Sequence, residues 1–209
     1  MPAGFSERER QVIKGRLLAA ALDALARGGL NAASVADLAK EADIAKGSFY
    51  AFYPTKEHLF MEALESIEDD YRTRFSSAAE GEGTPVERLE RCFRAAFDLA
   101  ESEPALRHLD MRTAERLARA LPPDRVEEHA ARDRAAIEKI VNRWKSQGLL
   151  ADNAGSAEIA AAGYAVFLTS VGLANFPAEM AAATRDIVSR GLARALAAGC
   201  GGSNEQGGA

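Results

Sequence analysis

The chain has few of the residues on which disulfide frameworks and metal centres depend. Its 209 residues include two cysteines, Cys92 and Cys200, and three histidines. Two cysteines are too few for a disulfide framework. The histidines never stand four residues apart or in an H-E-x-x-H order, so we predict no metal site. A reducing cytoplasm is the expected setting.

Enzyme motifs, strand patterns and a signal peptide are also missing from the sequence. There is no G-x-S-x-G and no glycine-rich phosphate loop, so we predict no catalytic residue and no cofactor, and we do not expect an enzyme. The N-terminus lacks a basic start followed by an apolar run, which argues against a signal peptide. No segment alternates apolar and polar residues for long, so the predicted fold is all-α with about nine helices.

One long stretch, residues 159–176, has no charged residue. Its 18 residues reach the length of a membrane-spanning helix. Alanine, glycine, serine, threonine and asparagine make up much of it, and no basic residues flank it. We therefore expect a buried helix and no membrane partner, because a helix that is apolar all round is buried in a core or in a bilayer.

The charge of the chain is unevenly distributed. Residues 1–60 carry 8 Lys/Arg and 7 Asp/Glu, whereas the rest carries 18 and 24, within a net charge of -5. The charged fraction of 27% and the apolar fraction of 47% are those of a globular protein. This split suits a nucleic-acid-binding domain attached to an acidic part that does not touch nucleic acid.

Two short helices joined by a tight turn are predicted between Ser34 and Tyr53. Ser34 is a residue type that caps helix starts, and apolar residues follow it at helical spacing up to Ala42. The next three residues suffice only for a turn, and the second helix is predicted from Lys46 to Tyr53. A helix-turn-helix of this kind places its second helix in the DNA major groove, although an ordinary pair of packed helices gives the same pattern.

The motif around this turn resembles the DNA-binding domain of the tetracycline-repressor (TetR) family of transcriptional regulators. The residues that match the family pattern are Ser34, Val35, Leu38, Ala39, Ala42, Gly47, Ser48, Phe49, Tyr50, Thr55, Lys56, Glu57 and Leu59. Four places depart from it: Asp43, Ile44, Ala45 and the pair Phe52-Tyr53. Asp43 suits a turn because aspartate tolerates left-handed backbone, whereas Ala45 cannot cap a helix. The DNA-binding residues that the resemblance implies are Ser34, Lys46, Gly47, Ser48, Tyr50, Tyr53 and Lys56.

The resemblance also implies a domain division and two further partners. The expected domains are a DNA-binding domain at 8–54, an effector-binding and dimerisation domain at 55–198, and a flexible tail at 199–209. A small-molecule effector is expected among aromatic and polar side chains of the second domain, and the last two predicted helices, rich in alanine and glycine, are expected to form a homodimer. The candidate effector-binding residues are Phe93, Phe97, His108, Arg112, Trp144, Tyr164 and Phe167.

The function that these patterns favour is a homodimeric regulator that binds a near-palindromic operator in double-stranded DNA. In the resembled family such a protein is usually a repressor released by its effector. One alternative is a helical interaction protein whose second domain binds a protein or peptide, with the DNA-binding domain as a tether. A redox role for Cys92 is weighed against a buried apolar role, which this residue type more often has.

Overall fold

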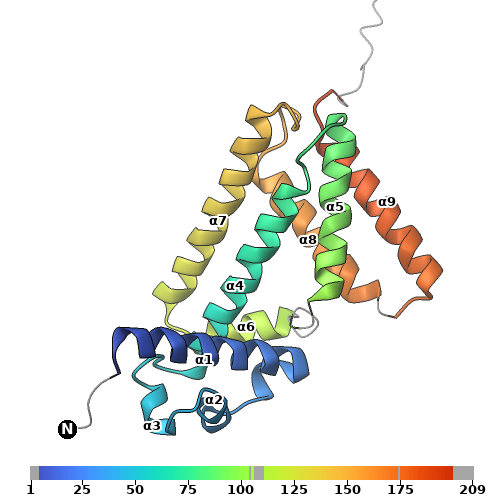
Figure 1. Cartoon of the computed structure of the whole chain (residues 1–209). Helices are drawn as coiled ribbons and strands as arrows, with labels where there is room; N and C mark the ends of the chain where they lie inside the picture. Colours follow the sequence, from blue (N-terminus) through green and yellow to red (C-terminus); the bar gives the residue numbers. More distant parts are fainter. Residues whose placement is uncertain (1–4, 104, 106–110, 174, 200–209) are drawn as a thin grey trace, which may run out of the picture. The chain divides into compact units, whose positions relative to one another are not determined.

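The structure is a computed structural model, and it describes residues 5–103, 105, 111–173 and 175–199, without the side chains of residues 111, 112 and 114. The described residues form nine α-helices and one 3-10 helix (Figure 1), which confirms the predicted all-α fold. The helices are α1 (Glu7–Gly28), η1 (Gly29–Asn31), α2 (Val35–Glu41), α3 (Lys46–Phe49), α4 (Lys56–Ser77), α5 (Pro85–Ser102), α6 (Met111–Ala120), α7 (Pro123–Ser146), α8 (Ser156–Leu173) and α9 (Ala178–Leu196).

The chain divides into two packing units. The head unit comprises Met1–Asp70 and Ser102–His129, and the body unit comprises Tyr71–Glu101 and Ala130–Ala209. Helices α4 and α7 each contribute residues to both units. This division describes packing, so the functional boundary expected near residue 54 stays a prediction.

Helix α1 is capped at both ends by local hydrogen bonds. Ser6 caps its start through a capping box in which the Ser6 hydroxyl accepts from the Glu9 amide and the Glu9 carboxylate accepts from the Ser6 amide. At its end, the N–H of Gly29 donates to the Leu25 carbonyl. At φ 73 this position favours glycine, which has no Cβ to clash.

The turn between α2 and α3 has the backbone expected from its sequence. Asp43 is the one described non-glycine residue with positive φ, at 58°. The second helix is shorter than predicted, because α3 ends at Phe49 instead of Tyr53. The amides of Ala51 and Phe52 donate three residues back, to Ser48 and Phe49, which is the tighter bonding of a 3-10 turn.

The core of the head unit joins the short helices to α1, α4 and α6. Phe49 of α3 and Leu38 of α2 are buried together with Leu17 of α1 and Phe60 of α4. In Figure 1, α1 lies across α2 and α3. Leu117 of α6 is only 2% exposed and belongs to the same core, so α6 packs with the predicted DNA-binding helices.

The body unit has its own core around Trp144. Trp144 of α7 is fully buried beside Phe75 of α4 and Phe93 of α5.

Helix α8 was expected to be buried, yet only Ile159, Ala162 and Val166 of this helix are buried. It is long and apolar enough to cross a membrane by length and composition alone, and 17% of it is buried within the chain. An apolar helix of this kind has more hydrophobic surface than one neighbouring core can cover.

Candidate nucleic-acid interface and body core

The hydroxyl of Ser34 is engaged in capping α2. It accepts a hydrogen bond from the Asp37 amide at 3.3 Å and donates to the Asp37 carboxylate at 2.6 Å. The Ser34 amide also donates to this carboxylate, at 2.9 Å. These side-chain and backbone hydrogen bonds from Ser34 lower the pKa of Asp37. Ser34 therefore fixes the start of α2, and a contact of its side chain with DNA is a prediction that the free chain does not test.

Helix α3 presents most of its predicted DNA-contacting residues to solvent. Lys46 and Gly47 are exposed, Tyr50 at the C-terminal end is 55% exposed, and Ser48 is half-buried. Phe49 points into the core and is fully buried. Ala45, at the N-cap position, makes no side-chain capping bond, as its residue type dictates. One side of α3 is thus packed in the core. The other side carries small residues and hydrogen-bond donors, which suits a helix that enters a DNA groove.

Tyr53 is placed differently from the other predicted contacts. It is 4% exposed, and its ring centroid lies 6.0 Å from that of Phe49. Burial, and then the nearby negative charge of Glu62, raise the pKa of the Tyr53 phenol above its ordinary value. The predicted contact between Tyr53 and DNA has no support in this arrangement, because its side chain belongs to the core of the head unit.

Two basic side chains of α1, Arg10 and Lys14, are bound to other parts of the head unit. Arg10 donates to the Ala51 carbonyl at 3.1 Å and lies 5.1 Å from the ring centroid of Phe52. Lys14 pairs with Glu62 at 2.8 Å. Arg10 therefore covers the aromatic residue that stands where the family pattern has a polar tip, a cation–π contact that the sequence analysis missed.

The aromatic residues predicted to line an effector site fall into two groups. Phe93, Phe97 and Trp144 are buried in the body-unit core, at 1%, 2% and 0% exposure. Tyr164 is 49% exposed on α8, and Phe167 is half-buried, with its ring centroid 6.5 Å from that of Tyr164. The structure brings the first group together and leaves the second on the surface of α8. His108 and the side chain of Arg112 lie outside the described residues.

Cys92 lies fully buried in the same core. Burial raises the pKa of its thiol to about 12. The thiolate is the reactive form of cysteine, and it is scarce at neutral pH when the pKa is this high. The structure therefore favours the apolar role for Cys92 over the redox role.

The sequence of the head unit matches a known family. The profile described as "Bacterial regulatory proteins, tetR family" matches residues 17–63, which contain α2, the turn, α3 and the start of α4. The HTH-type transcriptional repressor KstR2 of Mycobacterium tuberculosis is 29% identical over 135 residues, which cover 65% of this chain and 68% of that protein.

Residues 17–63 are a TetR-family DNA-binding domain. The chain is therefore a helix-turn-helix DNA-binding transcriptional regulator. The HTH-type transcriptional repressor KstR of Mycolicibacterium smegmatis is 36% identical to this chain over 84 residues, 40% of this chain and 41% of that protein. These comparisons support the interpretation as a transcriptional regulator. They give no support to the alternative of an interaction protein.

The fold of this chain is shared along most of its length by solved regulators. The structure of KstR2 of Mycobacterium tuberculosis covers 93% of this chain and 97% of its own at a TM-score of 0.52 and 22% identity. The fatty acid degradation regulator FadR from Bacillus halodurans covers 91% and 96% at a TM-score of 0.64 and 14% identity. At such identities the likeness concerns the fold alone.

A buried carboxylate in the head unit was not found by the sequence analysis. Glu65 of α4 is 5% exposed and accepts from Arg125 of α7 at 2.7 Å and pairs with His129 at 3.2 Å. The hydrogen bond that Arg125 donates to Glu65 raises the pKa of Arg125. Glu65 stands four residues after the buried Met61, a spacing that indicates the same face of α4.

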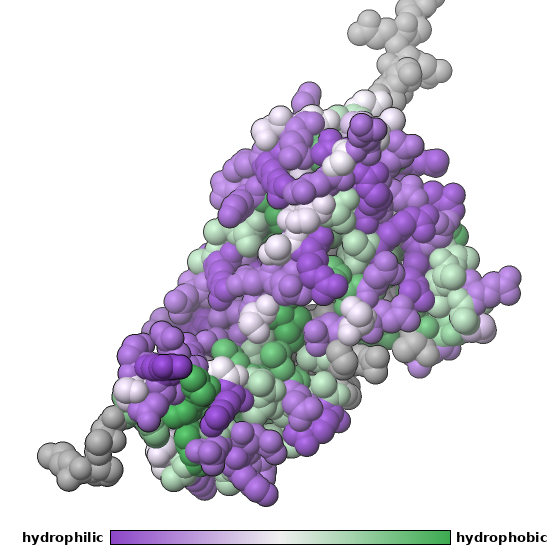
Figure 2. Space-filling model, viewed as in Figure 1, coloured by the Kyte–Doolittle hydropathy of each residue, from purple (hydrophilic) through white to green (hydrophobic). Residues whose placement is uncertain are grey.

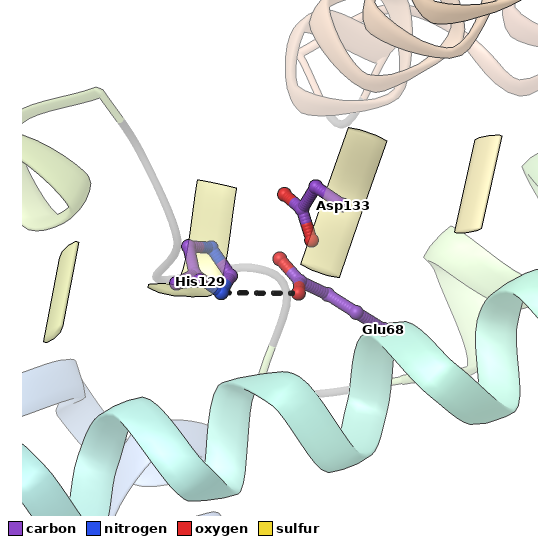
Figure 3. A group of neighbouring side chains, drawn as sticks. All are labelled: Glu68, His129 and Asp133. Carbon is purple, nitrogen blue, oxygen red and sulfur yellow. Dashed lines mark ion pairs between the residues drawn. The ribbon is translucent and has the colours of Figure 1, made fainter. Parts of the chain in front are cut away.

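His129 has a second acidic neighbour on α4. Its Nδ1 lies 3.9 Å from the carboxylate of Glu68, the ion pair dashed in Figure 3. Asp133, also drawn there, belongs to the body unit and is held by Arg72 at 2.6 Å. Glu68 and His129 thus form an ion pair within the head unit.

Proposed function

We propose that this protein is a homodimeric repressor that binds a near-palindromic operator in double-stranded DNA and is released by a small-molecule effector. The proposal rests on the presence of two surfaces in one chain: an exposed α3 surface in the head unit and an exposed apolar strip on α8 and α9. The chemistry is binding, without a bond-making step, and the cytoplasm is the expected site of action.

The α8–α9 strip comprises six of the eight large hydrophobic residues that are exposed in the described part of the chain. They are 47–67% exposed: Tyr164, Leu168, Val171, Phe176, Met180 and Ile187. Pale green surface at the right of Figure 2 lies over this end of the body unit. Soluble monomers rarely expose contiguous apolar patches, and such patches mark protein interfaces.

A second copy of this chain is the occupant that fits the strip. Helices α8 and α9 contact each other and lie side by side in Figure 1, so two copies related by a two-fold axis would bring four helices together. The exposed glycines Gly163 and Gly191 have no other atom within 4 Å of where a Cβ would stand. Helices can approach closely where side chains are this small. An isologous dimer presents two α3 helices with the same symmetry, which is why its operator should be near-palindromic.

Oligomeric state is tested by light scattering on the full-length chain. Ile187→Glu places a charge on the most exposed residue of the strip, at 67%, and should convert dimer to monomer. Val12→Glu is the matched control, because Val12 is 49% exposed on α1 in the head unit, and this variant should keep the mass of a dimer. A monomeric wild-type protein, or an Ile187→Glu dimer of unchanged stability, would refute this part of the proposal.

Operator recognition is tested by selecting duplexes from a random-sequence library. The selected sites should be near-palindromes with half-sites about one helical turn apart or somewhat more. A footprint on a single asymmetric half-site would contradict the dimeric arrangement.

Effector binding is proposed for the body-unit core around Phe93, Phe97 and Trp144. The RolR regulator, whose structure in complex with resorcinol has a TM-score of 0.59 to this chain, gives one probe, and the description of KstR2 as a ketosteroid regulator gives a second. Trp144 is the single tryptophan, so its fluorescence reports on this core directly. A ligand that releases the selected duplex should also change this fluorescence. Release of the duplex without a change in Trp144 fluorescence would show that the effector binds outside this core.

A further inference from the structure

The first residue of α4 is tied to the connection between α1 and α2. The ammonium group of Lys56 donates to the carbonyl of Leu30 at 3.0 Å and to the carbonyl of Ala33 at 3.1 Å. Leu30 lies in η1, and Ala33 directly precedes Ser34, the N-cap of α2. Lys56 is half-buried, and two of its three N–H donors are occupied by these bonds.

The electrostatics of this position oppose a lysine unless the carbonyls compensate for it. A positive charge in the first turn of a helix is disfavoured, because the helix macrodipole has its positive end there. The carbonyl of Leu30 belongs to the short helix η1, and the carbonyl of Ala33 belongs to the connection that leads into α2. Both oxygens carry partial negative charge, so the ammonium of Lys56 joins this connection to the start of α4 with charge-assisted hydrogen bonds.

The hydrogen bonds of Lys56 fix the segment before α2, and α2 in turn packs against α3. Ala33 leads directly into the Ser34–Asp37 capping box, which fixes the first turn of α2. Helix α2 is packed against α3 through Leu38 and Phe49, both buried in one core. Beside Lys56, the hydroxyl of Thr55 lies 3.0 Å from Nδ1 of His58. The start of α4 therefore sets where α2 begins, and α2 sets the placement of α3.

We propose that Lys56 is a positioning residue for operator binding, acting through the carbonyls of Leu30 and Ala33. The proposal rests on the DNA-binding function of the head unit. It differs from a direct contact of Lys56 with DNA, the role that the family resemblance implies. A lysine that contacts a phosphate affects the affinity for all DNA sequences alike. A positioning residue orients α3, so its loss should weaken binding to the correct sequence more than binding to any other.

Three variants separate the two roles of Lys56. Lys56→Met removes the donors and the charge, whereas Lys56→Gln removes the charge and keeps an N–H donor for a carbonyl. Lys46→Met is the matched control, because Lys46 is an exposed lysine at the start of α3. Each full-length variant is titrated over a range of salt concentrations with a duplex selected by the wild-type protein and with a scrambled duplex of equal length and composition.

The expected result is a loss of specificity with little change in salt dependence. Lys56→Met should weaken binding to the selected duplex by about tenfold or more, the scale of one lost charge-assisted hydrogen bond, while binding to the scrambled duplex changes by less than about twofold. Lys56→Gln should recover part of this ratio. Lys46→Met should weaken both duplexes and reduce the salt slope by about 0.9 if Lys46 contacts one phosphate.

Hydrogen–deuterium exchange gives a readout that needs no DNA. Lys56→Met should accelerate exchange of the amides in residues 29–38, and Lys46→Met should not. If the wild-type protein selects no duplex, the DNA-binding function fails, and exchange still tests the tie. The positioning role is overturned if Lys56→Met weakens both duplexes equally and lowers the salt slope by about 0.9, or if affinity, slope and exchange are all unchanged.

Discussion

Gly47 is the residue of α3 whose substitution separates stability from DNA binding. It is exposed, and a Cβ added there would meet no other atom within 4 Å. Its φ is not positive, so an alanine fits the existing backbone. Alanine is favoured over glycine inside a helix by about 0.5–1 kcal/mol, which corresponds to a rise in Tm of about 1–4 °C for a chain of this length. Gly47→Ala should therefore stabilise the free protein.

The same methyl group should weaken operator binding. If α3 lies in the major groove, the bare backbone at Gly47 permits close approach to DNA. A methyl group forced into a closely packed contact costs about 1–3 kcal/mol, or about 5- to 150-fold in affinity. Because the two effects have opposite signs, misfolding of the variant cannot account for the loss of affinity.

The assay combines calorimetry at a fixed protein concentration with fluorescence anisotropy on a selected duplex. Gly15→Ala is the control, because Gly15 lies within α1 and is likewise exposed with no atom within 4 Å of its Cβ position. It should raise Tm by a similar amount and leave affinity unchanged. A Gly47→Ala protein that binds the duplex as tightly as wild type would refute the reasoning that the α3 backbone approaches DNA at this residue.

Three further outcomes follow from the described contacts. Arg125→Met leaves the buried Glu65 carboxylate without its guanidinium partner and should lower the free energy of unfolding by about 3 kcal/mol, measured by urea denaturation. In a Cys200→Ser background, Cys92 should resist iodoacetamide at pH 8 in the folded protein and react after unfolding, because its thiol pKa is raised to about 12. Ser34→Ala should lower Tm by about 2–4 °C at pH 7. The difference in Tm between wild type and Ser34→Ala should shrink as the pH falls below about 4. The Asp37 carboxylate, whose pKa is lowered in the folded protein, then becomes protonated and no longer stabilises the cap.

Each of these outcomes has a control. Arg119→Met removes the exposed pair with Glu115, whose side chains are 80% and 58% exposed, and should change stability by less than about 0.5 kcal/mol. Equal effects of the two arginine substitutions would show that Glu65 is not held as a buried charge. Rapid alkylation of folded Cys92 would show that its core opens frequently. A pH-independent effect of Ser34→Ala would show that the carboxylate contributes nothing to the cap.

Local features of this protein could be predicted from the sequence because they depend on a few neighbouring residues. Ser34 caps α2 and Asp43 adopts positive φ, as their residue types favour. Helical spacing correctly placed Leu38 and Phe49 in the core. The resulting motif was sufficient to identify the family, because a helix-turn-helix is assembled from such local preferences.

Features that depend on distant partners were decided by the tertiary structure. Spacing indicates which face of a helix a residue occupies, and it does not indicate what lies opposite. Lys56 is bonded to a carbonyl 26 residues earlier in the sequence, and Glu65 is paired with an arginine 60 residues later. Neither partner can be found from the sequence, because the compensating groups come from distant segments of the chain.

Helices α6 and α8 illustrate the same limit for whole elements. Both have apolar faces in the sequence, but only the packing showed that Leu117 of α6 completes the head-unit core, whereas Tyr164, Leu168 and Val171 of α8 remain exposed. The hydrophobic effect drives apolar surface out of water without specifying the surface that covers it. The sequence by itself determined the helices, their caps and the DNA-binding motif, and the tertiary structure decided which faces of those helices are covered within one chain.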